Sequence, residues 1–270
     1  QILNSQSTVD LYGDLAFGNN LFDLTINSAG VAGYQNTGKQ TTINARKLTL
    51  ANNENGSFTT SPALSSGTLP ALGNGSLNIN AESVVLGNNT VRLAGYDQIE
   101  ISATKETIAQ SKASADSSGV TPNKLIADNN LTINTPVLTA SQKANYVIEA
   151  GAGELKSGLL KIQGTQGVQP TSSGLASSEG AKLKLTSDKV ILAGGVTDPS
   201  NSVDKQAANV VLKGGQVTVE ATGTSATDSV VIENGAGINV QGTAFVLNDQ
   251  MVDLSAGKVA LKSNNGDVEV

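Results

Sequence analysis

One short stretch of this chain decides its fold: Leu77-Asn78-Ile79-Asn80-Ala81-Glu82-Ser83-Val84-Val85-Leu86-Gly87-Asn88. Its first half alternates apolar and polar residues, which indicates a β-strand with one buried side. Ala81 is small enough for a corner, a second apolar strand follows, and the closing Gly-Asn tolerates the left-handed backbone of a tight turn. The same plan returns in Leu183-Lys184-Leu185-Thr186-Ser187-Asp188-Lys189-Val190-Ile191-Leu192-Ala193-Gly194. The sequence therefore predicts a repeated strand–corner–strand unit.

Apolar triplets echo this unit near the C-terminus at a nearly fixed spacing. One series begins at positions 217, 238 and 259, and a second begins at positions 210, 230 and 252. A fixed short period marks a repeat architecture, in which each unit buries its apolar side by stacking on the next. The first series is Val217-Thr218-Val219, Ile238-Asn239-Val240 and Val259-Ala260-Leu261, and the second is Val210-Val211-Leu212, Val230-Val231-Ile232 and Val252-Asp253-Leu254.

These patterns predict an all-β fold, a parallel β-helix (β-solenoid) with coils of about 20–22 residues. Strands that follow one another in a coil pair in parallel with the next coil, and the crossover rule favours a right-handed helix. We expect residues 1–270 to form a single β-solenoid segment of roughly nine or ten coils. Because the chain opens on Gln1 and ends within the alternation of residues 267–270, we expect it to be a piece of a longer chain.

Polar stretches interrupt the repeat and are predicted to leave the helix at its corners. They are rich in Ser, Thr, Gly and Ala, and each follows a strand-like triplet. Such insertions either contribute to a binding face or decorate the surface. We expect them near residues 57–75, 105–123, 164–180 and 195–208. Between the strands lie Gly- and Asn-rich corners, where stacked coils would place Asn on Asn in amide ladders.

The composition excludes several kinds of chemistry. The chain has no Cys, so neither disulfides nor zinc–thiolate sites are possible, and it has no His, which is the usual general base and the commonest metal ligand. Its 17 basic and 23 acidic residues give a net charge of −6, and no basic stripe favours nucleic acid. No apolar run approaches the roughly 20 residues that span a bilayer.

The sequence offers no strong candidate for a catalytic, cofactor-binding or metal site, so we expect no cofactor and no enzyme activity. β-Helices also include polysaccharide lyases and hydrolases, and glycoside hydrolysis needs two carboxylates at a defined separation. The nearest acidic pairings are Asp97 with Glu100 and Asp249 with Asp253, and alternation predicts that Glu100 points outward. The one oxygen-rich loop, residues 198–204, is interpreted as an ordinary turn, although calcium prefers such ligands.

Several phrases resemble the repeat region of filamentous haemagglutinin-like proteins, the giant exoproteins of Gram-negative two-partner secretion. The resemblance lies in Asn130-Leu131-Thr132-Ile133, Ser76-Leu77-Asn78-Ile79-Asn80-Ala81-Glu82-Ser83-Val84 and Ala181-Lys182-Leu183-Lys184-Leu185. This chain departs from the family pattern in its ragged period and long insertions. The resemblance implies a secreted or bacterial cell-surface adhesin, an outer-membrane secretion partner and a host or matrix receptor of unknown identity.

The function expected from the sequence is structural: the shaft of a filamentous adhesin that mediates cell adhesion or biofilm attachment. Its partners would be neighbouring coils or copies of the same protein, and no nucleic acid. One alternative is a self-polymerising extracellular filament or sheath subunit, joined end to end through open β edges. A carbohydrate-active β-helix enzyme is the third reading, and it requires an acidic cluster on stacked coils.

Overall fold

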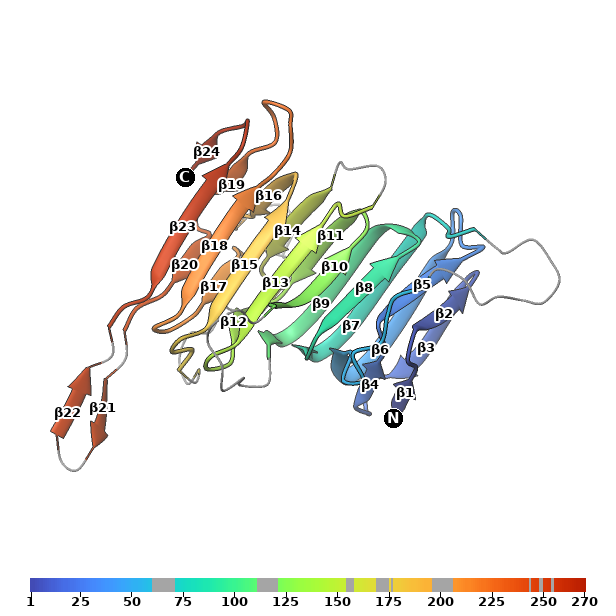
Figure 1. Cartoon of the computed structure of the whole chain (residues 1–270), viewed down its shortest axis with the longest axis horizontal. Coiled ribbons are helices and arrows are strands. Elements are labelled where there is room, and N and C mark those ends of the chain that lie inside the picture. The colour runs from blue at the N-terminus through green and yellow to red at the C-terminus, as the bar shows by residue number, and fades with distance from the viewer. Residues whose placement is uncertain are drawn as a thin grey trace.

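The computed structural model describes residues 1–59, 71–110, 121–153, 158–168, 175, 177–195, 206–242, 244–247, 250–253 and 255–270. Within them the secondary structure is entirely β, and the strands stack in parallel in a fixed order. Figure 1 shows them side by side as a ladder from the N-terminal to the C-terminal end. The predicted all-β parallel β-helix is therefore confirmed. Among the described residues there is no apolar helix of membrane-crossing length.

The strands form three columns, which we call the first, second and third faces. The first and third faces belong to one fourteen-stranded sheet, because the long strands β6, β7 and β9 bend at a corner and contribute to both. The second face is a separate eight-stranded sheet. It contains β2 (Thr8–Tyr12), β5 (Gly30–Tyr34), β8 (Thr90–Ala94), β10 (Asn123–Ala127), β13 (Asn145–Ala150), β15 (Lys182–Ser187), β18 (Gln216–Ala221) and β23 (Lys258–Ser263).

The other two faces share the three long strands, β6 (Gln40–Ala51), β7 (Gly75–Leu86) and β9 (Tyr96–Ala109). The first face holds their C-terminal halves together with β1 (Ile2–Asn4), β4 (Leu24–Asn27), β12 (Leu138–Ala140), β17 (Asn209–Val211) and β20 (Gly237–Asn239). The third face holds their N-terminal halves together with β3 (Leu15–Asn19), β11 (Asn130–Asn134), β14 (Leu159–Gln163), β16 (Lys189–Leu192), β19 (Val230–Ile232) and β24 (Val268–Glu269).

The described strands make nine coils, but the three faces do not hold equal numbers of strands. In the third coil the chain leaves the second face between β6 and β7, so β5 pairs directly with β8. In the seventh coil it leaves the first face, so β12 pairs directly with β17. The third face therefore holds nine strands, while the first and second faces hold eight each.

The core consists of columns to which most coils add one aliphatic side chain. The pleat sends alternate side chains inward, and the parallel register places each on its counterpart in the next coil. Between its two end members, every residue of one such column is at most 1% exposed. That column on the third face contains Phe17, Ile43, Ile79, Ile101, Ile133, Ile162, Leu192 and Ile232.

The corners also follow the sequence prediction. Asn55 and Asn89 adopt positive φ angles of 50° and 60°, which Asn tolerates better than most residues. Stacked asparagines form amide contacts between coils: the Asn88 side-chain amide donates to Asn53 Oδ1 at 3.1 Å. Ala81 lies at the corner of β7, in register with the equally small Ala45 and Ala103.

The regular echo of apolar triplets, in contrast, is not the coil repeat where it was found. Val217 stacks on Val259 of the second face, whereas the intervening Ile238 belongs to the first face and stacks on Val210. All faces use the same apolar–polar alternation, so triplets from different faces look alike. The expected coil length is approached only where no insertion intervenes, as between Thr8 and its partner Gly30.

The second series of triplets fails in the same way. Its three members lie on the first face, on the third face and outside the helix altogether. Val252 belongs to the hairpin of β21 (Ala244–Leu247) and β22 (Gln250–Asp253), whose strands pair only with each other and antiparallel. The hairpin stands apart from the ladder in Figure 1, as an insertion that the sequence did not predict.

The boundaries of the expected insertions also need correction. Residues 105–109 belong to β9, and Asn123 begins β10, so both ends of this expected insertion are strand. The inward residues of this half-strand are Thr107 and Ala109, which lack the bulk that signals a core. Gly75 likewise begins β7. Residues 60–70, 111–120, 169–174, 176 and 196–205 of the expected insertions lie outside the described residues.

Three buried tyrosines interrupt the aliphatic interior. Tyr34, Tyr96 and Tyr146 are at most 1% exposed, and the hydroxyls of Tyr34 and Tyr146 have no hydrogen-bond partner among the described residues, whereas the Tyr96 hydroxyl lies near the hydroxyl of Thr41. Burial raises the pKa of each above the ordinary value of 10.0, because the phenolate would lose its hydration. The unpaired hydroxyls of Tyr34 and Tyr146 are a cost to stability, since they gave up hydrogen bonds to water on folding.

We expect Ile133→Ala to lower the free energy of unfolding by about 2–5 kcal/mol, because it opens a cavity in a continuous column. Thr132→Ala, on the outward side of the same strand, is the matched control and should change it by no more than about 0.5 kcal/mol. Urea denaturation measures both. Equal effects of the two substitutions would contradict the inward assignment of Ile133.

We expect Tyr146→Phe to raise the free energy of unfolding at neutral pH by about 1 kcal/mol, because it removes a buried hydroxyl without a partner. The pKa of Tyr146 is higher in the folded state, so the unfolded state ionises first and stability falls as pH rises above about 10. The variant should lose less stability than the wild type between pH 9 and 11. If the free energy of unfolding changed with pH in the same way for the variant and the wild type, Tyr146 would not be buried in its neutral form.

Candidate functional site

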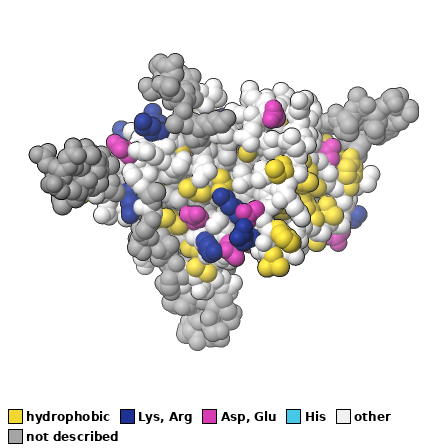
Figure 2. Space-filling model, turned by 90° about the horizontal axis from the view of Figure 1, so that it is seen from below, with side chains coloured by type: hydrophobic (Ala, Val, Ile, Leu, Met, Phe, Trp, Pro, Cys, Tyr) yellow, Lys and Arg dark blue, Asp and Glu magenta, His cyan; other side chains and the backbone are white. Residues whose placement is uncertain are grey.

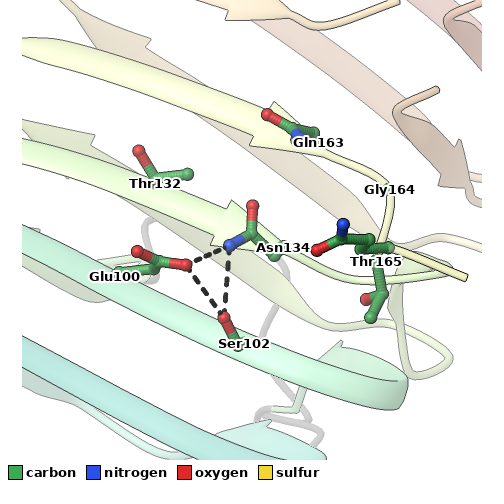
Figure 3. Close-up of a pocket in the computed structure, with 8 residues that line it drawn as sticks. Glu100, Ser102, Thr132, Asn134, Gln163, Gly164 and Thr165 are labelled. Carbon is green, nitrogen blue, oxygen red and sulfur yellow. Dashed lines mark hydrogen bonds between the residues drawn. The ribbon is translucent and has the colours of Figure 1, made fainter. Parts of the chain in front are cut away.

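A polar groove lies on the outer side of the third face. It crosses β9, β11 and β14 and encloses about 430 Å³. Figure 3 shows its side chains projecting from three successive coils toward a common space. The lining residues are Glu100, Ser102, Thr132, Asn134, Gln163, Gly164, Thr165 and Gln166.

The pleat and the register build this groove. Ile99 and Ile101 point into the core, so Glu100 and Ser102 must point outward, as the sequence predicted for Glu100. Two outward columns result. In one, Ser102 of β9 pairs with Asn134 of β11, which pairs with Gln163 of β14. In the other, Glu100 of β9 pairs with Thr132 of β11. Neighbouring side chains along each column are thus about 4.8 Å apart.

The turn after β14 forms one wall of the groove. The Thr165 hydroxyl donates to the carbonyl oxygen of Ala103 at 2.5 Å, which ties the turn to the corner of β9. The backbone N–H of Gly164 donates to the carbonyl oxygen of Gln206 at 3.0 Å. These bonds hold the wall to two segments that are distant from it in the sequence.

Hydrogen bonds fix the carboxylate of Glu100 within the groove. The Asn134 side-chain amide donates to Glu100 Oε1 at 2.6 Å and to Ser102 Oγ at 3.2 Å, and Ser102 Oγ donates to the same Glu100 oxygen at 3.2 Å. The Thr132 hydroxyl and the Gln163 amide have no partner among the described residues. The groove therefore combines one oriented carboxylate with unused donors and acceptors, which suits a hydroxyl-rich ligand.

The groove does not contain the carboxylate pair that glycoside hydrolysis requires, as far as its described lining shows. Glu100 is the only acidic residue in that lining. Asp97, its nearest acidic neighbour in sequence, instead accepts a hydrogen bond from the Asn129 amide at 3.2 Å. The geometry supports binding through hydrogen bonds.

The remaining acidic candidates are not brought together. Asp253 lies in the hairpin strand β22, while Asp249 and the loop of residues 198–204 lie outside the described residues. Across the described part of the chain, no group of three or more acidic side chains is placed to hold a metal ion.

The second face carries ion pairs that link neighbouring coils by one rule. Each pair joins a Lys or Arg on one coil to an Asp or Glu on the next coil. The acidic residue lies two positions after the residue that is the direct register partner of the Lys or Arg. Arg92 faces Ile126 and bonds to Asp128 at 2.5 Å. By the same rule Lys124 faces Val147 and lies 3.8 Å from Glu149, and Lys184 faces Thr218 and pairs with Glu220.

The sequence could not have located the groove or the ion-pair rule. The spacing from Ser102 to Asn134 differs from the spacing from Asn134 to Gln163, because the coils differ in length. The spacing from Arg92 to Asp128 differs from both, so no fixed period aligns these residues. The only available signal was the outward position of each residue in its own strand.

Comparisons of the chain with protein-family models, with curated proteins and with solved structures found no match. The kinship to filamentous haemagglutinin-like proteins stays a prediction from the sequence.

We expect a double-mutant cycle on Lys184→Ala and Glu220→Ala to give a coupling energy of about 0.2–1 kcal/mol, because the pair is partly exposed. The coupling should shrink in about 1 M salt, which screens such charges. Lys182→Ala in the same strand, combined with Glu220→Ala, is the control and should show no coupling. Salt-independent coupling would mean that packing, and not charge, links the two residues.

Proposed function

We propose that this chain is a structural shaft segment of a secreted or cell-surface filamentous adhesin. The observation that carries the proposal is the unbroken column that runs through all nine coils from Leu15 to Val268. A fold built this way is quasi-one-dimensional, since each coil contacts only its neighbours. It extends by about 4.8 Å per coil, or about 40 Å over nine coils.

The architecture suits a mechanical role. Every strand of an internal coil pairs on both sides, which leaves no open backbone edge along the described rod. Where a coil lacks a strand on one face, the strands of the coils on either side pair directly, so the columns of that face continue. A shaft of this kind projects or spaces whatever it carries, and the corner loops and the groove at Glu100 are the surfaces on which it could meet a host or matrix receptor.

The adhesin part of the proposal rests on the resemblance of the repeat to filamentous haemagglutinin-like proteins. On that basis the chain is exported with an outer-membrane secretion partner and acts outside the cell in attachment or biofilm formation. The absence of Cys fits a protein whose stability comes from stacking and not from disulfides.

A second candidate is the subunit of a self-polymerising filament or sheath. The specific observation in its favour is the parallel, in-register stacking of the internal coils, because a coil of another copy can continue the same pairing.

We expect antibodies against the purified chain to label intact cells of the source bacterium, and deletion of its gene to reduce attachment severalfold. Adding the purified chain in excess to wild-type cells distinguishes a shaft from a receptor-binding segment. A shaft should leave attachment of the cells unchanged, whereas a segment that binds the receptor should block attachment. An unlabelled cell surface together with unchanged attachment in the deletion strain would overturn the proposal.

A further inference from the structure

The outward side of the third face carries polar residues well beyond the groove. One column of them takes a residue from each of the second to sixth coils, and none of its side chains is buried. This column is Thr42, Asn78, Glu100, Thr132 and Lys161. In the seventh and eighth coils the same column continues as Ile191 and Val231, so its polar part is a bounded stretch within the rod.

A second outward column lies beside the first and has the same chemistry. It is Asn44, Asn80, Ser102, Asn134 and Gln163. The Asn80 side-chain amide donates to Asn44 Oδ1 at 3.1 Å, as the Asn134 amide does to Ser102 Oγ at 3.2 Å. We call the two columns the polar strip. It consists of amides and hydroxyls, with Glu100 and Lys161 as its two charges.

The composition of the polar strip narrows the kind of ligand that fits it. The strip contains none of the aromatic or Arg side chains that dominate the binding energy of protein interfaces. Its one Lys is balanced by its one Glu, so it does not attract an anionic polymer such as a nucleic acid. Figure 2 shows a different kind of surface, where basic and acidic side chains lie side by side near the middle of the view. The strip instead suits a neutral ligand with many hydrogen-bonding groups.

The groove at Glu100 supplies the most ordered hydrogen-bonding groups of the strip. Glu100 Oε1 accepts from Asn134 and Ser102, while Oε2 has no partner among the described residues. A carboxylate held in this way is oriented before a ligand arrives, which lowers the entropy cost of binding. Its free oxygen, the Thr132 hydroxyl and the Gln163 amide match sugar hydroxyls, which both donate and accept.

The direction of the strip sets the direction of the ligand. The strands run across the rod, whereas the two columns run along its axis, and the groove crosses β9, β11 and β14 in that axial direction. Each coil advances the columns by about 4.8 Å. This spacing is comparable to the length of one sugar residue in an extended polysaccharide chain, so successive sugars would meet successive coils.

We propose that the polar strip binds an uncharged polysaccharide as an extended chain parallel to the axis of the rod, with its closest contacts in the groove at Glu100. The inference rests on the proposed function, and it names the chemical class of matrix ligand that the side of the shaft meets. Because the contacts repeat from coil to coil, the affinity is the sum of many weak hydrogen bonds along the chain.

Affinity electrophoresis of the purified chain tests the proposal. Native gels that contain dextran, mannan, galactan or a β-glucan provide neutral probes, and a gel that contains alginate provides an acidic one. We expect at least one neutral polysaccharide to slow the wild-type chain, and alginate to slow it less or not at all. Retardation by no neutral polysaccharide, or at least equal retardation by alginate, would overturn the proposal.

Substitutions within the strip locate the binding surface. Asn134→Leu and Thr132→Leu should each weaken binding at least about tenfold, because hydroxyls of the ligand lose their partners. Gln216→Leu makes the same kind of change at an exposed position of β18 on the second face, and this matched control should bind like the wild type. Urea denaturation midpoints verify that each variant is folded. Normal binding by both strip variants, or an equal loss in the control, would contradict the assignment.

Glu100→Gln separates a hydroxyl-rich ligand from a cationic one. The glutamine keeps a hydrogen-bonding oxygen and removes only the charge, so binding of the neutral polysaccharide should change by less than about threefold. Complete loss of binding would mean that the groove recognises positive charge, which the proposal does not allow.

Competition by fragments of the retarding polysaccharide tests the axial direction. Longer oligosaccharides should compete more strongly until they span the strip, because each further coil adds contacts. A single sugar that competes as well as the longest fragment would overturn the extended arrangement. A chain that binds no polysaccharide leaves the shaft proposal to its own attachment assay, which uses no such probe.

Discussion

A buried aliphatic side chain in this rod has to fit between the side chains that the register places in the coil above and in the coil below. That requirement comes from the parallel register, which allows each inward residue no other neighbours along the axis. The column through Ile133 meets it with Ile in five successive coils. The scarcity of aromatic residues follows from the same constraint, since a bulky ring needs a matching space in its neighbouring coils.

The outward residues stack in the same register as the inward ones, but they are polar or charged. The residues between the inward ones also stack, and there the chain places amides, hydroxyls and alternating charges. The groove at Glu100 and the ion pairs of the second face are two products of this outward stacking. Because the strands keep one parallel register, coils of very different length still deliver their outward residues to the same columns. Closing longer loops costs little extra entropy, so this freedom is thermodynamically cheap.

The sequence predicted the fold class because alternation and Gly-Asn corners are local signals, and Leu77–Asn88 carries both. It did not predict the true stacking partners. The strands of all three faces show the same alternation of apolar and polar residues, and the insertions give the coils different lengths, so no constant period links a residue to its partner. Thr107 and Ala109 were interpreted as loop because their burial depends on the neighbouring coils and not on their own hydrophobicity. The groove depends on register between strands that are far apart in the sequence, and only the outward position of Glu100 could be inferred in advance.

The unequal number of strands on the three faces has a geometric consequence. The third face is longer than either of the others by one strand spacing, about 4.8 Å, over a rod only nine coils long. A body with one longer side cannot be straight, so the axis bends with the third face on its convex side. The groove at Glu100 therefore lies on the convex side, where β9, β11 and β14 keep their parallel register and present their polar groups.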